Sequence, residues 1–123
     1  MKILVVDDVP AVQVSISTAL EAAGHAVSLA SSGKQALSRI ESEAFDVVVT
    51  DLWMPDGDGL RLIKQLRDQS GGPRVIAITG GGPKLSIELA GSLAEVWGAE
   101  HVLLKPFDDR RLVALVEGLT PRV

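Results

Sequence analysis

Cysteine is absent from the chain, which excludes disulfide bonds and thiolate chemistry. Hydrophobic residues make up 46% of the sequence, yet no apolar run approaches the roughly 20 residues that a membrane-spanning helix needs. The first eight residues place one lysine before a short apolar run that ends in two aspartates. That pattern is typical of a strand and not of a signal peptide. We therefore expect a soluble protein in the cytoplasm, with no membrane partner.

An excess of positive charge is also missing, since the formal net charge is −4 at neutral pH. Nucleic acids attract basic surfaces, so we expect no direct binding to nucleic acid. The 123 residues lie within the usual range for one domain and can bury one ordinary core. Only a few residues follow the last expected helix. We therefore expect a single domain over residues 1–120 and no output domain in this chain.

Five short apolar runs alternate with five segments of helical periodicity. The runs predict strands at 3–6, 26–30, 45–50, 74–78 and 101–104, and the segments predict helices at 9–23, 34–43, 60–69, 85–97 and 108–119. Residues 4–6 and 47–49 are apolar at consecutive positions. Both faces of their sheet should therefore be covered, which favours a parallel sheet between helical layers. The sequence predicts an α/β fold of the doubly wound (βα)₅ type.

Polar residues with chemical potential stand where the predicted strands end. Asp7 and Asp8 end the first strand, Asp51 follows the third, Thr79 ends the fourth and Lys105 follows the fifth. Because ligands bind beyond the carboxyl ends of the strands in such sheets, we expect these five side chains at one edge. Crowded carboxylates repel and raise one another's pKa unless a cation neutralises them, and hard oxygen ligands suit Mg²⁺.

Each of these residues also has a simpler explanation when it is considered alone. Asp7 and Asp8 lie just before a predicted helix, where acids commonly cap the helix N-terminus. An acid such as Asp51 is common after a strand. The combination of acids after the first and third strands with Lys105 after the fifth favours a shared site over these separate explanations.

Together these residues resemble the receiver-domain signature of two-component response regulators. The motifs are Asp7-Asp8, Asp51-x-x-Met54-Pro55-x-x-x-Gly59, Thr79-Gly80 and Lys105-Pro106-Phe107. They occur in the family's order, and the resemblance covers essentially the whole chain. It implies a flavodoxin-like receiver fold with strand order 2-1-3-4-5, as in the single-domain, CheY-like members of the family.

The resemblance implies that Asp51 accepts a phosphoryl group from a sensor histidine kinase or a histidine phosphotransfer protein. The side chains of Asp8 and Asp51 would hold Mg²⁺ together with the backbone carbonyl of Trp53, while Asp7 would act mainly through water.

Lys105 and Thr79 would contact phosphate oxygens, and the change would switch a surface that binds a downstream protein. The sequence does not identify that protein. Such a chain is a signalling phosphoacceptor and not an enzyme, because it catalyses only its own phosphorylation and dephosphorylation.

Four features depart from the family pattern or vary within it. Val102 occupies the position where receivers usually carry an aromatic switch residue. The stretch after Thr79 is about four residues longer than usual, and the helix expected at 85–97 has a second apolar stripe that favours either extra burial or a homodimer surface. Trp53 stands two positions after the acceptor, where side-chain bulk can shield the phosphate from water. We therefore predict slow autodephosphorylation.

Two other functions use similar residues. A Mg²⁺-dependent phosphohydrolase also forms an aspartyl phosphate, but it needs a general acid two residues after the nucleophile, where Trp53 stands, and long insertions that cap the substrate. A receiver-like module could instead bind partners without phosphorylation. The presence of Asp8, Asp51, Thr79 and Lys105 argues against that module. Val102, in place of the usual aromatic switch residue, leaves it as an alternative.

Overall fold

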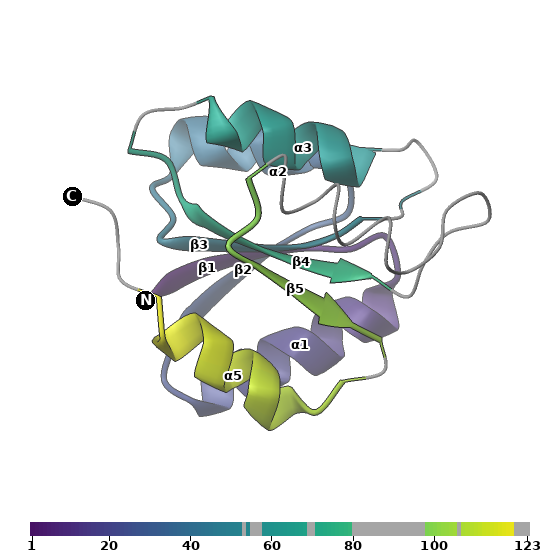
Figure 1. Ribbon diagram of the computed structural model, residues 1–123, viewed down its shortest axis with the longest axis vertical. Helices are drawn as coiled ribbons and strands as arrows, with labels where there is room; N and C mark the ends of the chain where they lie inside the picture. Colours follow the sequence, from purple (N-terminus) through teal and green to yellow (C-terminus); the bar gives the residue numbers. More distant parts are fainter. Residues whose placement is uncertain (53, 55–57, 69–70, 80–97, 106, 120–123) are drawn as a thin grey trace.

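The computed structural model describes residues 1–123 except 53, 55–57, 69–70, 80–97, 106 and 120–123. Five parallel strands form one sheet in the order β2-β1-β3-β4-β5 (Figure 1). The strands are β1 (Lys2–Val6), β2 (Ala26–Ala30), β3 (Val47–Asp51), β4 (Arg74–Thr79) and β5 (His101–Leu104). The described helices are α1 (Pro10–Ala22), α2 (Gly33–Ser42), α3 (Asp58–Arg67) and α5 (Asp109–Glu117). The predicted α/β class and strand order are confirmed.

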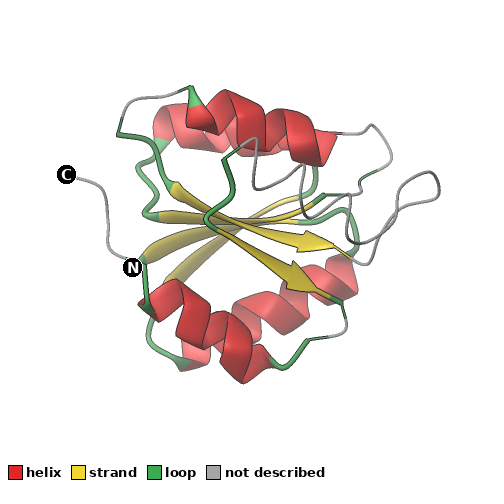
Figure 2. Ribbon diagram, in the orientation of Figure 1, coloured by secondary structure: helices red, strands yellow, loops and turns green. Residues whose placement is uncertain are grey.

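The helices form two layers, one on each face of the sheet (Figures 1 and 2). Along β1, Ile3 and Val5 pack in the core beneath α1 and α5, whereas Leu4 and Val6 pack in the core beneath α2 and α3. All four side chains are at most 1% exposed. The consecutive apolar residues of the strand are therefore explained by burial on both faces, as the sequence predicted.

Short polar or proline signals begin the helices. Pro10 occupies the first turn of α1, where its missing N–H costs no helical hydrogen bond. The hydroxyl oxygen of Ser32 accepts a hydrogen bond from Gln35 N at 3.1 Å and caps α2. The carboxylate of Asp108 caps α5 in the same way by accepting from Arg110 N at 2.8 Å. Among the described helices, none is both long and apolar enough to cross a membrane.

Several predicted boundaries differ from the structure. The strands at 26–30 and 101–104 are found as predicted, but β3 begins at Val47 and not at Phe45. Phe45 is buried before the strand starts, so its hydrophobicity reflects packing and not strand pairing. Asp51 is the last residue of β3 and pairs with Ile78, whereas the sequence placed it after the strand. The helix predicted at 85–97 lies outside the described residues.

Helical periodicity in the sequence predicts a core stripe on α1 at Val9, Val12, Ile16, Leu20 and Ala23, and the structure buries only part of it. Ile16 and Leu20 are buried as expected. Val9 is 44% exposed and Ala23 is exposed, because these residues are the N-cap and C-cap and so lie beyond the regular helix. Gln13 lies in the interior instead, with only 8% of its surface exposed.

Candidate functional site

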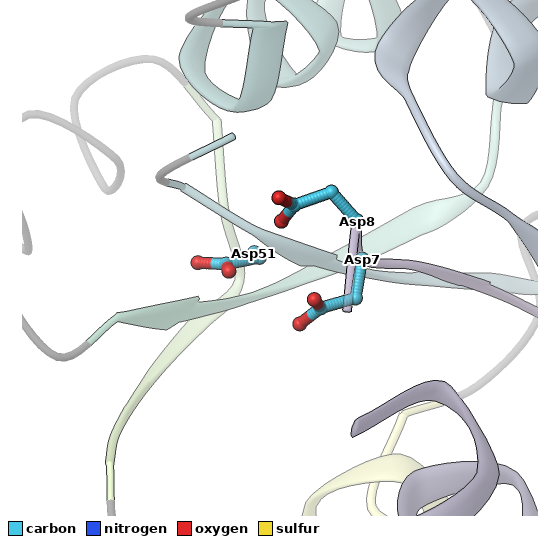
Figure 3. A group of neighbouring side chains, drawn as sticks. All are labelled: Asp7, Asp8 and Asp51. Carbon is cyan, nitrogen blue, oxygen red and sulfur yellow. The ribbon is translucent and has the colours of Figure 1, made fainter. Parts of the chain in front are cut away.

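Three aspartates meet at the carboxyl edge of the sheet (Figure 3). Asp7 and Asp8 directly follow β1, and Asp51 ends the neighbouring strand β3. One carboxylate oxygen from each residue lies within 4.8 Å of the others. Asp7 and Asp51 are 1% and 5% exposed, and Asp8 is the more accessible of the three. The parallel register therefore places together side chains that are more than forty positions apart in the sequence.

Lys105 brings the positive charge of the site from the segment that follows β5. Its Nζ lies 3.2 Å from Asp51 Oδ2 and 3.8 Å from Asp7 Oδ2. The backbone N–H of Lys105 donates to the carbonyl oxygen of Thr79 at 2.9 Å. Thr79 ends β4, between the strands that lead to Asp51 and Lys105, and is fully buried. The side chains predicted at the ends of β1, β3 and β5 thus lie close together, and Thr79 ends β4, the strand between β3 and β5.

Asp7 has an unusual environment for a carboxylate. Its Oδ1 accepts a hydrogen bond from Val9 N at 2.9 Å, whereas its Oδ2 is buried and accepts none from any described residue. Burial raises the pKa of Asp7, and repulsion from Asp51 and Asp8 raises it further. The Val9 N–H and the Lys105 ammonium act in the opposite direction on this pKa. A second cation near Oδ2 would offset the cost of keeping Asp7 ionised.

The oxygen atoms of this cluster are suitable ligands for a hard divalent cation. All the side-chain ligand atoms at the cluster are carboxylate oxygens, which Mg²⁺ prefers, and the buried Oδ2 of Asp7 still has acceptor capacity. The alternative explanation of the acidic pair as a helix cap is wrong, because Val9 is the N-cap of α1 and no side chain caps that helix. Trp53, the predicted source of a backbone carbonyl ligand, lies outside the described residues.

Gly59 fixes how closely helix α3 approaches the end of β3. A Cβ atom at this position would lie 2.6 Å from Leu52 Cα and would also press on the backbone oxygens of Asp51 and Leu52. Leu52 is itself tied to the sheet, because its N–H donates to the Ile78 carbonyl at 3.0 Å. The glycine in the motif after Asp51 is therefore required by close packing beside the site.

One residue near the site was missed by the sequence interpretation. Gln13, on the inner side of α1, places its amide nitrogen 2.6 Å from the carbonyl oxygen of Asp7. The signal in the sequence was a polar residue between Val12 and Ile16, which the predicted core stripe passed over. A polar residue that faces a core needs a partner, and this one has it at the aspartate pair.

Comparison with known proteins identifies the family. Residues 3–117 match the response regulator receiver domain. The response regulator MprA of Mycolicibacterium vanbaalenii is 38% identical over 122 residues, which cover 99% of this chain and 51% of that protein. The chain thus belongs to the receiver domains of two-component response regulators. It spans about half the length of the curated relatives it matches.

Solved structures agree with this assignment. The crystal structure of a CheY-like receiver domain protein from Methanospirillum hungatei has a TM-score of 0.84 at 29% identity, covering 94% of this chain and 90% of the other. A response regulator from Burkholderia pseudomallei, solved with a phosphorylated aspartic acid, calcium ion and citrate, has a TM-score of 0.80 at 30% identity. That match covers 92% of this chain and 64% of the other.

Proposed function

We propose that this receiver domain accepts a phosphoryl group on Asp51 in a Mg²⁺-dependent reaction and thereby switches a surface that binds a downstream protein. The observation that carries the proposal is the contact of Asp51 Oδ2 with Lys105 Nζ at 3.2 Å, beside the carboxylates of Asp7 and Asp8. A nucleophile, a cation for the phosphoryl oxygens and a set of metal ligands are then adjacent. The phosphorylated aspartic acid and calcium ion of the Burkholderia relative support the same chemistry.

In the proposed reaction, an oxygen of Asp51 forms a bond to phosphorus while the P–N bond to a donor histidine breaks and the imidazole leaves. The ammonium of Lys105 already lies on one Asp51 oxygen and is placed to stabilise negative charge on a phosphoryl oxygen. Thr79, one strand away, is the candidate hydrogen-bond donor to the product phosphate. Asp51 is 5% exposed, which limits the access of water to the aspartyl phosphate.

Asp8 and Asp51 would hold the Mg²⁺ ion through their carboxylates and Asp7 mainly through water, with the carbonyl of Trp53 as a further proposed ligand. When bound, the ion supplies positive charge at the transferring phosphoryl oxygens. Asp51 would then serve both as a ligand and as the nucleophile, so that the attacking oxygen is oriented by the same contacts that neutralise the site.

A groove beside Lys105 is the proposed docking place for the histidine-bearing segment of a sensor kinase or phosphotransfer protein. It lies between α1 and the segment that leads into α5, and its lining residues are Ala11, Val12, Ser15, Ile16, Lys105, Phe107 and Asp109. Most of this lining is apolar, which suits a helix that packs against α1. A donor histidine presented there would lie near the ammonium and hence near Asp51.

The test is phosphorylation by a small phosphodonor with Mg²⁺, followed by intact-mass measurement. We expect one added phosphate that is lost in Asp51→Asn and when Mg²⁺ is chelated. Asp46→Asn is the matched control, because Asp46 lies at the opposite edge of the sheet, where its Oδ2 accepts from Lys2 N at 2.8 Å. An adduct that persists in Asp51→Asn, or no adduct on the wild type, would refute Asp51 as the acceptor.

Other expectations stay predictions. They include the receiver domain bounds of 1–120, the cytoplasmic location, and the role of a signalling phosphoacceptor as opposed to an enzyme. The homodimer surface expected at 85–97 lies outside the described residues. The phosphohydrolase and the phosphorylation-independent module gain no specific support from the site.

A further inference from the structure

The side chain of Gln13 joins helix α1 to the ends of two strands. Its Nε2 donates to the carbonyl of Asp7 at 2.6 Å and to the carbonyl of Ala30 at 3.1 Å, and Ser31 Oγ lies 3.3 Å away. The Ala30 carbonyl also accepts from the N–H of Asp7 at 3.1 Å. An amide group has two N–H bonds to donate, so its donor capacity is matched by these two carbonyl oxygens.

These hydrogen bonds hold the backbone of the Asp7–Asp8 pair from the side of the protein core. The carbonyl of Asp7 belongs to the peptide group that it shares with Asp8, and Gln13 holds that carbonyl from the core side. The Asp7 carboxylate is held separately, through the hydrogen bond from Val9 N to Oδ1. Because the backbone carbonyl and the side-chain carboxylate of Asp7 are both held by hydrogen bonds, the orientation of the peptide group that leads to Asp8 is fixed.

We propose that Gln13 is a positioning residue that orients the Asp7–Asp8 peptide and thereby sets the affinity of the site for Mg²⁺. The inference rests on the proposed function, because it assumes that the aspartates hold the ion. Without the Gln13 amide, the Asp7 carbonyl keeps an unsatisfied acceptor in the protein interior and gains by turning toward water. That turn rotates the peptide and moves the Asp8 carboxylate away from those of Asp7 and Asp51.

The variants Gln13→Met and Gln13→Asn test this role. Methionine keeps the length of the side chain but has no N–H, whereas asparagine keeps the amide on a side chain shorter by one methylene. Ser17→Ala is the matched control, because Ser17 is also 8% exposed on α1 but donates only to Val14 O within its own helix, at 3.1 Å. This control removes a buried polar group whose hydrogen bond lies within α1 and does not reach Asp7.

Titration calorimetry with Mg²⁺ gives the dissociation constant, and urea unfolding of the metal-free protein gives the stability. We expect both Gln13 variants to bind Mg²⁺ at least roughly tenfold more weakly, as for other residues that orient metal ligands, and Ser17→Ala to bind within twofold of wild type. With a small phosphodonor, the Gln13 variants should need more Mg²⁺ for half-maximal phosphorylation but should approach the wild-type rate at saturation.

Lower stability with an unchanged Mg²⁺ dissociation constant would overturn the proposal, and so would a failure of both variants to fold, because Gln13 would then support the fold as a whole. These outcomes differ from a failure of the proposed function. In that case the wild-type protein itself would bind no Mg²⁺ or take up no phosphate on Asp51.

Discussion

Replacing Asp7 by asparagine should stabilise the metal-free protein, although it removes a proposed metal ligand. The Asp7 carboxylate is 1% exposed, and its Oδ2 accepts no hydrogen bond from any described residue. The carboxylates of Asp51 and Asp8 lie close by. Asparagine is nearly the same size, carries no charge and offers an N–H₂ group where the carboxylate repels its neighbours.

The expected change in the free energy of unfolding for Asp7→Asn is the difference between two opposing contributions. A buried acceptor without a partner costs about 1–3 kcal/mol, which the substitution relieves. The substitution also removes the attraction between Asp7 Oδ2 and Lys105 Nζ at 3.8 Å, but Lys105 is partly exposed, so this loss is at most about 1 kcal/mol. We expect a net gain of about 1–2 kcal/mol in the free energy of unfolding.

The gain should depend on pH in a defined direction. Burial and the neighbouring acids raise the pKa of Asp7 in the folded protein, so the folded state holds this proton more tightly than the unfolded state. The contribution of Asp7 to stability is therefore fully present below the unfolded pKa and is lost as pH rises through the folded pKa. The advantage of Asp7→Asn should be largest at neutral pH and should shrink on acidification.

Urea unfolding followed by circular dichroism, with a chelator present, measures this effect. Asp46→Asn serves as control and should not stabilise, because asparagine keeps an oxygen that can accept from Lys2 N but loses the charge that strengthens this hydrogen bond. Saturating Mg²⁺ should stabilise the wild type more than Asp7→Asn. If metal-free Asp7→Asn is less stable than wild type at neutral pH, the reasoning about the buried carboxylate is wrong.

Two further predictions concern the residues on the acceptor side. Gly59→Ala should lower the free energy of unfolding by more than about 2 kcal/mol, because the added Cβ would lie 2.6 Å from Leu52 Cα. The control Gly118→Ala, whose Cβ would make only ordinary contacts, should change it by less than about 1 kcal/mol. Urea unfolding measures both variants, and equal effects would contradict the packing argument. Trp53→Asn should lose phosphate faster than wild type, because a small polar side chain shields the aspartyl phosphate less from water; a time course of intact mass after donor removal measures the loss, and an unchanged rate would contradict the shielding.

The fold and the meeting of the acidic residues were accessible from the sequence for a geometric reason. Parallel strands end at one edge of their sheet, so polar residues at strand ends such as Asp7, Asp51 and Lys105 must come close once the strands are recognised. The strands were recognisable because residues such as those of β1 are apolar on both faces.

The remaining details depend on packing that a linear pattern does not contain. Phe45 looked like a strand residue because hydrophobicity does not distinguish a buried residue before a strand from one in it. Gln13 was left out of the predicted core stripe because helical periodicity selects apolar residues for the core. The sequence shows a polar residue at 13 and a glycine at 59, but it does not show the hydrogen bond of Gln13 to Asp7 or the close approach of Gly59 to Leu52.

The charged side chains gathered around Asp51 also determine how the formal charge of the site would change on phosphorylation. If all three carboxylates carry their formal charge, three negative charges and the positive charge of Lys105 leave the site at −2, which one bound divalent cation would neutralise. In the proposed reaction, conversion of Asp51 to an aspartyl phosphate would replace one negative charge by two, so that a metal-bound site would change from neutral to −1. In the proposed function, a single unbalanced negative charge beside the end of β3 would attract hydrogen-bond donors, and the buried Thr79 at the end of the neighbouring strand β4 is the proposed donor. In the proposed function, the first physical change in signalling would therefore be one unit of negative charge that neither the bound cation nor Lys105 neutralises.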